Sequence, residues 1–323
     1  MDPAISDFLL TFNAILWEAV PFILLGAIVA GLLEEFLPQQ AITRFLPKAV
    51  VPAVMIGAVL GMVFPMCECG ILVVMRRLLR KGLPLSCCIA YMLAGPIINV
   101  VVIFSTWVAF KDHKIGWDMV GLRVGLAFIV ACLTALVVQY QYNRHGNALL
   151  AATAVPNTEP TPAGEDSLVP GVPVRKKTAM DRLGNVSATA LHDFADITVF
   201  LILGAVLAAI AKQNISPDQI ETLSREQPFL TIPAMMLLAV LMCLCSEADA
   251  FVAASFTNMH VSAKLGFLVL GPMLDLKLLL MYTRVFKPRL ILTLVICTSV
   301  FTLALCLIVH VVYRANGWTG LPG

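Results

Sequence analysis

Long apolar stretches alternate with short polar segments along the whole chain. A helix needs about 20 apolar residues to cross a hydrocarbon core of about 30 Å, and a chain in lipid must satisfy its own backbone hydrogen bonds, which favours helices. The pattern predicts an all-α polytopic membrane protein with about eight transmembrane helices. They are expected over residues 8–33, 49–66, 83–110, 117–141, 190–211, 229–246, 265–283 and 290–313.

The composition agrees with this pattern. Hydrophobic residues make up 59% of the chain and charged residues only 13%, whereas soluble domains carry about 25% charged residues. The net charge of +2 argues against a nucleic-acid partner, so membrane lipid is the expected surrounding. The first apolar stretch, from Phe8, lacks a basic leader and a cleavage site, and we interpret it as a retained helix.

Residues 143–185 interrupt the apolar pattern. The segment carries five prolines with scattered Gly, Ser and Thr, a composition typical of flexible linkers. We therefore divide the chain into a first transmembrane repeat over residues 1–142, a flexible Pro-rich linker over 143–185 and a second transmembrane repeat over 186–323.

Basic residues suggest which side of the membrane the linker faces. The run Arg175-Lys176-Lys177 near its end favours the cytoplasm. About four spans precede the linker, so the N-terminus is expected on the same side. A basic stretch in the first half fits this arrangement: Arg76, Arg77, Arg80 and Lys81. Lys287 and Arg289 fall on the opposite side and disagree with it.

An internal repeat links the two halves. A shift of 176 residues (67 to 243) superimposes two cysteines and a Gly-Pro pair. Cys67 and Cys69 fall on Cys243 and Cys245, and Gly95-Pro96 falls on Gly271-Pro272. Transporters are often built from two such halves, with substrate bound at their interface. Four spans per half favour a parallel repeat, but an uncounted re-entrant segment in each half would make it inverted, and the sequence leaves both open.

The first candidate site is Cys67-Glu68-Cys69, at the end of an uncharged span. Two thiols one residue apart can meet one soft ion where the backbone turns, and thiolates select soft and borderline metals and metalloids. The alternative is that each buried cysteine acts as a small hydrophobe. The recurrence of the pair in the second half favours a ligand role.

The second candidate site lies at the end of the predicted span over 229–246 and directly after it. Cys245 and Ser246 are followed by Glu247 and Asp249, and the chain then becomes apolar again. Ionisable groups at membrane depth are costly and usually serve an ion path or a proton relay. The alternative is that the span ends here and the acids lie in water.

The third candidate is the Gly-Pro pair in each half, followed three residues later by Asn99 or Asp275. Proline within a helix frees a carbonyl from its hydrogen bond, and broken helices line many transporter sites. The alternative is an ordinary packing kink. Lys277 is a nearby partner for Asp275 or for another acid.

These arguments define one set of candidate residues. The candidate substrate-binding residues are Cys67, Glu68, Cys69, Gly95, Pro96, Asn99, Cys245, Ser246, Glu247, Asp249, Gly271, Pro272 and Asp275. The candidate metal ligands are Cys67, Cys69 and Cys245. We expect no catalytic residue and no cofactor, because the chain carries no nucleotide-binding loop, H-E-x-x-H pair or G-x-S-x-G elbow.

Three segments resemble the signatures of a known family. They are the stretch from Cys67-x-Cys69-Gly70 to Pro84-Leu85, the segment Ala94–Asn99, and the segment Ser246–Phe256. They resemble a bacterial predicted-permease family that includes the ArsP organoarsenical exporters and the YraQ-like permeases. The resemblance implies a multi-pass permease of the bacterial inner membrane; some members of the family export trivalent organoarsenicals, and many have no known substrate. Glu68 stands where a small polar residue is expected, which points to a different cargo in this subgroup.

The leading hypothesis is a secondary transporter, not an enzyme, that exports a soft metalloid or metal species. The thiols would contact the soft atom, and Glu68, Glu247 and Asp249 would carry protons or compensate charge during alternating access. The alternatives are a permease for another small thiophilic or anionic solute, an intramembrane thiol oxidoreductase, and an assembly protein. The sequence allows a homo-oligomer without requiring one.

Overall fold

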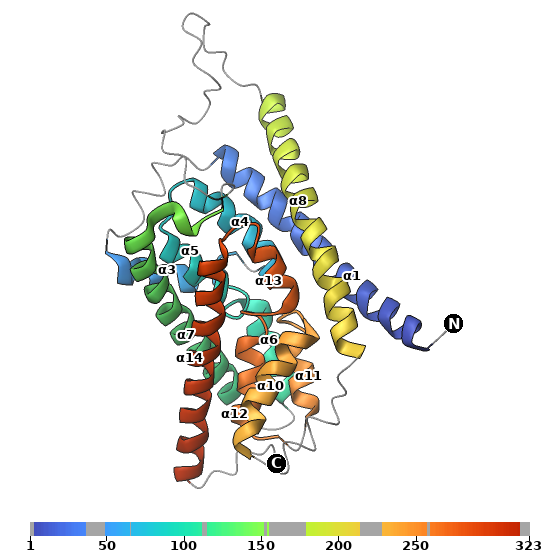
Figure 1. Cartoon of the computed structure of the whole chain (residues 1–323), viewed down its shortest axis with the longest axis vertical. Helices are drawn as coiled ribbons and strands as arrows, with labels where there is room; N and C mark the ends of the chain where they lie inside the picture. The colour runs from blue at the N-terminus through green and yellow to red at the C-terminus, as the bar shows by residue number, and fades with distance from the viewer. Residues whose placement is uncertain are drawn as a thin grey trace, which may run out of the picture.

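A computed structural model describes residues 3–36, 49–64, 66–111, 115–151, 154, 179–213, 228–256 and 259–316, and these residues fold into helices (Figure 1). Pro65, the basic run 175–177 and most of the predicted linker lie outside the described residues. The helices are α1 (Pro3–Phe36), α3 (Val50–Val59), η1 (Leu60–Met62), α4 (Glu68–Arg80), α5 (Leu85–Ala94), α6 (Val100–Phe110), α7 (Gly116–His145), η3 (Gly146–Leu149), α8 (Ala179–Gln213), α10 (Pro228–Met242), α11 (Asp249–Ser255), α12 (Val261–Leu270), α13 (Leu276–Tyr282) and α14 (Pro288–Ala315).

Four of the described helices are long and apolar enough to cross a membrane: α1, α7, α8 and α14. They correspond to four of the predicted spans. The other predicted spans contain helices of 15 residues or fewer, such as α10, which is about 22 Å long at 1.5 Å per residue. The all-helical membrane protein is therefore supported, whereas the number of eight spans stays a prediction.

The two Gly-Pro pairs interrupt two of the remaining predicted spans. The stretch over 83–110 consists of α5, which ends at Ala94, and α6, which begins at Val100. The stretch over 265–283 divides in the same way, because α12 ends at Leu270 and α13 begins at Leu276. Proline cannot donate a backbone hydrogen bond, and both α5 and α12 end before their pair, whereas α1 continues through Pro21 and α10 through Pro233.

Helices α1 and α8 pack side by side and run in opposite directions (Figure 1). Gly31, near the end of α1, lies against the backbone of Val186, near the start of α8. Ile15, in the first half of α1, packs with Ala205 and Ala208. The N-terminal end of α1 therefore lies at the end of the bundle opposite the start of α8. This differs from the expectation that the N-terminus and the linker share one side.

Helices α7 and α14 also pack with opposite directions. Gln141, near the end of α7, bonds to Thr293 in the first turns of α14, and the Lys287 amide donates to the Leu149 carbonyl at 3.0 Å. Lys287 therefore lies at the end of the bundle where the chain leaves η3, which directly follows α7. The expectation that Lys287 lies on the opposite side from the linker is wrong, because α10 is too short to carry the chain across.

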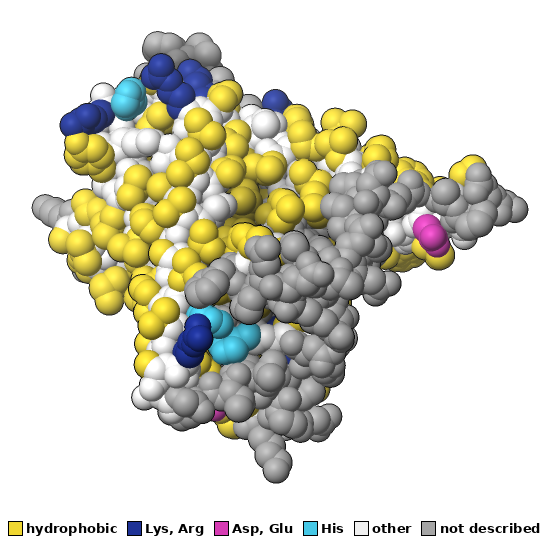
Figure 2. Space-filling view, turned by 60° about the horizontal axis from the view of Figure 1, so that its bottom comes forward, with side chains coloured by type: hydrophobic (Ala, Val, Ile, Leu, Met, Phe, Trp, Pro, Cys, Tyr) yellow, Lys and Arg dark blue, Asp and Glu magenta, His cyan; other side chains and the backbone are white. Residues whose placement is uncertain are grey.

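Two helices form the centre of the bundle. Every residue of α5 and every residue of α12 is buried, although both helices are short. The surrounding helices carry exposed apolar side chains such as Trp17, Trp117 and Val311. Figure 2 shows these hydrophobic side chains covering much of one face, with Lys and Arg gathered toward its edge. This is the surface expected of a protein that faces lipid.

Helix α1 crosses α4 at a pair of glycines. A Cβ atom built on Gly26 would lie 2.8 Å from the Gly70 Cα atom, so no side chain fits between the two backbones. The contact matters to the candidate site because Gly70 is in the first turn of α4, next to Cys69 and Glu68.

We expect Gly26→Ala to lower the free energy of unfolding by about 1–3 kcal/mol, because the added methyl group forces the two helices apart. The measurement is chemical unfolding of the purified protein in mixed micelles. Gly121→Ala is the matched control, since a Cβ atom at Gly121 would have nothing within 4 Å. Equal stability of the two variants would contradict the close crossing.

Candidate functional site

Interrupted helices from both halves of the chain meet at the centre of the molecule. Cys67 is the N-cap of α4 and Glu68 is its first residue. The non-helical residues 243–248 separate α10 from α11, and Asp275 is the N-cap of α13. The segment around Glu68 and the segment around Cys245, which are far apart in the sequence, are thereby brought together.

Lys277 joins these segments. Its Nζ atom lies 2.8 Å from the Glu68 Oε1 atom and 3.5 Å from the Asp275 Oδ2 atom. It donates to the Cys243 carbonyl at 3.3 Å and to the Cys245 Sγ atom at 3.8 Å. Lys277, Glu68 and Asp275 are each at most 2% exposed. A charge buried in this way is tolerated only with a partner. The positions of Lys277, Glu68 and Asp275 therefore depend on one another.

Three predicted thiols surround this ion pair. Cys67, Cys69 and Cys245 are buried and form no disulfide, and the side chains of Cys67 and Cys69 interact with each other. The Cys245 Sγ atom lies 3.8 Å from the Lys277 Nζ atom and is close enough to Glu68 for the two side chains to interact. Among the described residues, however, no three His, Cys, Asp or Glu side chains are grouped closely enough to hold a metal ion. The metal-ligand role of the three cysteines stays a prediction.

The backbone at Cys243 has an unusual conformation. Its φ angle is +50°, and no other residue except glycine has a positive φ in the part of the chain that the structure describes. Such a conformation costs about 1 kcal/mol or more outside glycine and is often found at functional sites. The turn ends α10 and points the Cys243 carbonyl toward Lys277.

A second buried ion pair lies beside the first. Arg123, in α7, binds both carboxylate oxygens of Asp249 at 2.8 Å. It also donates to the Thr106 hydroxyl at 2.7 Å and to the Ser246 carbonyl at 3.2 Å. Arg123 and Asp249 are 1% and 2% exposed. Asp249, predicted as a proton carrier, is therefore fully engaged in holding α7 against α11.

Glu247 differs from Asp249. It is partly exposed, and its Oε2 atom accepts a hydrogen bond of 3.4 Å from the Ser246 hydroxyl. Ser246 itself is buried. Of the two predicted acids in this segment, Glu247 is the one that is not engaged in a described ion pair.

The residues after the two Gly-Pro pairs have different roles. The Asn99 side chain accepts from the Val102 amide and donates to the Gly95 and Pro96 carbonyls, so it caps α6 and closes the turn. Asp275 accepts from the Leu278 amide through Oδ1, at 2.6 Å, and its second oxygen faces Lys277. The turn at Gly271-Pro272 thus places a carboxylate in the cluster, whereas the turn at Gly95-Pro96 places a neutral cap.

Two residues of this centre were missed from the sequence. Lys277 was considered only as a partner for an acid, and Arg123 was not considered. Both carry a signal that the sequence does contain, since each is a basic residue within an otherwise apolar stretch, and such residues are usually functional or paired.

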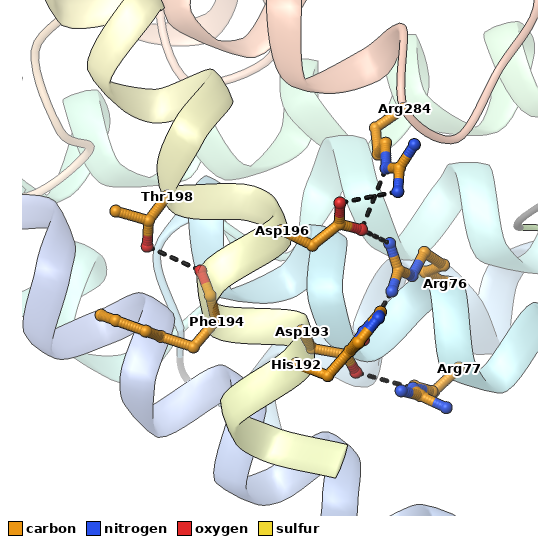
Figure 3. A network of polar contacts seen from close by, with 8 residues as sticks. All are labelled: Arg76, Arg77, His192, Asp193, Phe194, Asp196, Thr198 and Arg284. Atoms are coloured by element: carbon orange, nitrogen blue, oxygen red, sulfur yellow. Dashed lines mark hydrogen bonds and ion pairs between the residues drawn. The ribbon is translucent and has the colours of Figure 1, made fainter. Parts of the chain in front are cut away.

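A larger ionic network ties α4 to α8 (Figure 3). Asp193 binds Arg76 and Arg77, and Asp196 binds Arg76 and Arg284. Asp193 is fully buried, and the Asp196 side chain is 14% exposed. Arg76 and Arg77 were interpreted from the sequence only as part of a basic stretch on the side of the linker, whereas both side chains bind carboxylates of the second half.

Comparison with known proteins agrees with this architecture. A family model described as a predicted permease, of the ArsP type, matches residues 4–311. YcgR of Bacillus subtilis is 36% identical over 299 residues, which cover 92% of this chain and 95% of the relative. A Streptococcus mutans protein, provisionally named a two-component membrane permease complex subunit, is 35% identical over 301 residues, covering 93% of this chain and 94% of the relative.

A protein of Methanocaldococcus jannaschii is more distant, with 23% identity over 260 residues that cover 78% of this chain and 68% of the relative. No solved structure matches the chain. The family match extends over nearly all described helices and over both halves of the central cluster. The chain belongs to the ArsP-type family of predicted permeases.

Proposed function

We propose that this permease is a secondary transporter that exports a soft metal or metalloid species through the centre formed by Glu68, Lys277 and the surrounding cysteines. One observation carries the proposal. Thiols and carboxylates from both halves meet at interrupted helices in a buried region, and non-helical backbone at membrane depth is typical of transport sites.

The arrangement of the helices supports two inverted repeats. Helices α5 and α12, which cover Leu85–Ala94 and Val261–Leu270, are related by the shift of 176 residues (85 to 261). Helix α3 packs on α5 and α5 on α7, while α10 packs on α12 and α12 on α14. The related long helices run in opposite directions, which favours an inverted repeat over a parallel one. In this proposal α3–α4 and α10–α11 are the re-entrant segments, and alternating access moves one repeat against the other.

The cargo class follows from the donors. Thiolates bind soft and borderline metals and metalloids, and trivalent organoarsenicals are the first species to test. Proton coupling would then depend on Glu68 and Glu247, because Asp249 is held by Arg123. Among the described residues, Glu68 has no hydrogen-bond donor other than the Lys277 ammonium. Its second oxygen, Oε2, can therefore accept a proton or bind a cation.

The proposal places the protein in the bacterial cytoplasmic membrane, with the basic end of the bundle inside. That end carries Arg80, Lys81, Arg144 and Arg284, and Lys287 joins them in the structure. The name of the streptococcal relative extends the proposal to a second subunit, with which this chain would form the complete transporter.

We expect Cys245→Ser to reduce export at least about tenfold if the Sγ atom contacts the cargo, since serine is a poor ligand for soft ions. The measurement is flux into inverted membrane vesicles, with arsenicals, antimonite and divalent metals as separate cargoes. Cys306→Ser is the matched control, because Cys306 is equally buried but lies in α14, and it should retain flux. Full flux of every cargo in Cys245→Ser would refute the thiol site, and no flux of any cargo in the wild type would refute the function.

A further inference from the structure

We infer that Glu18 is a transport residue of this permease, and that its carboxyl takes up and releases the proton that is exchanged for the cargo. This inference rests on the proposed function and names the group that couples export to a proton gradient. The observation behind it is the position of Glu18, an acid without a cationic partner at the middle of a membrane-spanning helix.

Glu18 lies at the middle of the span Ile5–Leu33 of α1. It is partly exposed, and it forms no ion pair among the described residues. No Lys or Arg precedes Arg44 in the chain, so α1 itself supplies no counter-charge. An ionised carboxylate at this depth without a partner is costly. Glu18 is therefore stable next to lipid only as the neutral acid, and it can release its proton only toward water or another polar group.

The corresponding acid of the second half has a different role. In the proposed repeat, a shift of 178 residues (18 to 196) places Glu18 on Asp196, near the middle of the span Gly184–Ile210. Asp196 binds Arg76 and Arg284, each at 2.7 Å. Its charge is thereby explained by the packing of α8 on its neighbours. Glu18 has no such ion pair, so a role in fixing α1 does not explain its presence.

Contacts of α1 on either side of Glu18 place it beside the candidate site. Three residues before it, Ile15 packs in a small apolar cluster with Cys243. Four residues after it, the Phe22 carbonyl lies 2.9 Å from the position of a Cβ atom built on Gly70, in the first turn of α4. Residues three and four apart share one side of a helix. Glu18 therefore lies where the segment 243–248 and the start of α4 meet α1.

The charge of Glu18 acts on this centre, because its carboxyl is close enough to interact with Cys245 and Glu247. The ionisable groups around these residues come from the segment 243–248, the start of α4 and α13: Cys245, Glu247, Glu68, Cys69 and Lys277. Helix α8, which also packs on α1, carries no ionisable residue from 197 to 211. The one cation of this group, Lys277, is bound by Glu68 at 2.8 Å.

Protonation of Glu18 therefore changes the charge balance at the place where the cargo binds. The neutral carboxyl removes one negative charge from a centre that contains more acids than cations, and the ionised carboxyl restores it. In each cycle a Glu18 oxygen binds one proton from the water outside the cell and releases it to the cytoplasm, while one cargo moves outward. The partial exposure of Glu18 gives this proton a way to and from the carboxyl that the buried Glu68 lacks.

The test is the accumulation of methylarsenite or antimonite in inverted membrane vesicles under an imposed pH gradient, with the membrane potential held at zero. For one proton per cargo, the wild type should raise the accumulation ratio about tenfold for each pH unit by which the lumen is more acidic. Glu18→Gln should lose this tenfold dependence and retain the exchange of labelled for unlabelled cargo at equal pH. Glu18→Asp keeps a carboxyl and should remain sensitive to the gradient.

Asp7→Asn is the matched control, because Asp7 is an exposed acid in the first turns of the same helix, and it should accumulate cargo like the wild type. Equal gradient dependence in Glu18→Gln and the wild type would overturn the inference, and so would a joint loss of accumulation and exchange, which would assign Glu18 to the packing of α1. Wild-type flux that ignores the gradient would also overturn it and leave the transporter standing. No flux of any cargo would refute the proposed function itself.

A second measurement uses the wild-type protein and does not depend on the folding of a variant. Dicyclohexylcarbodiimide is an apolar reagent that adds to protonated carboxyl groups within membranes. It should label Glu18, as detected by mass spectrometry of the digested protein, and the labelling should decrease as the pH rises, because the ionised carboxylate does not add to the carbodiimide. No label at Glu18, or a label that is independent of pH, would overturn the inference.

Discussion

Asp249→Asn is expected to lower the free energy of unfolding by about 3–5 kcal/mol, the usual cost of removing one partner from a buried ion pair. The Asp249 carboxylate accepts two hydrogen bonds of 2.8 Å from Arg123, and both residues are almost completely buried. The amide keeps the size of the side chain but leaves the guanidinium without a counter-charge in a region that water does not reach. Chemical unfolding in mixed micelles and the amount of protein in the membrane measure the loss.

The neighbouring acid provides the control. Glu247→Gln should change stability by less than about 0.5 kcal/mol, because partly exposed polar positions contribute little, and any loss of flux in it would then reflect transport. The double variant Arg123→Leu with Asp249→Leu should recover much of the stability lost in Asp249→Asn, since an apolar pair can replace a buried ion pair. Normal stability of Asp249→Asn would mean that the pair does not hold α7 against α11.

Asp193→Asn is expected to lower the free energy of unfolding by about 3 kcal/mol or more, because the buried Asp193 carboxylate binds two arginines. Its two oxygens bind Arg76 and the Arg77 Nε atom, and none of its side chain is exposed. Asp196 shares Arg76 and binds Arg284 at 2.7 Å, but 14% of its side chain is exposed. Water can solvate part of the Asp196 site, so Asp196→Asn should lower the free energy of unfolding by less than Asp193→Asn.

His192→Ala serves as the control for this network. The His192 side chain is 73% exposed and lies 3.9 Å from Asp193, a contact that solvent screens. The variant should unfold at the same denaturant concentration as the wild type. If Asp193→Asn behaved like His192→Ala, the network in Figure 3 would not be what fixes α4 to α8.

Local features of the sequence predicted the local structure well. The four long helices follow from continuous apolar stretches, and the interruptions between α5 and α6 and between α12 and α13 follow from Gly95-Pro96 and Gly271-Pro272. Each of these depends on neighbouring residues alone. The family followed from short motifs in both halves, and the family match extends over residues 4–311.

The pairing of charges could not be predicted in the same way. Arg123 binds Asp249 and not the nearby Glu247 because of the way the chain turns between Ser246 and the start of α11. The geometry of this turn cannot be predicted from the sequence. The basic Lys287 was placed on the wrong side because a short helix was counted as a full crossing. The partners of Arg76 lie 117 and 120 residues away, beyond the reach of any periodicity argument.

Three buried ion pairs among the described residues join the first half of the chain to the second. Arg76 binds Asp193, Glu68 binds Lys277, and Arg123 binds Asp249, which follows it by 126 residues. During synthesis the first half therefore enters the bilayer while its charges are still unmatched. We expect this stage to be slow and to need the shelter of the translocon or of an insertase. A ribosome that stalls in the linker would leave a product that the cell's membrane proteases recognise by those charges.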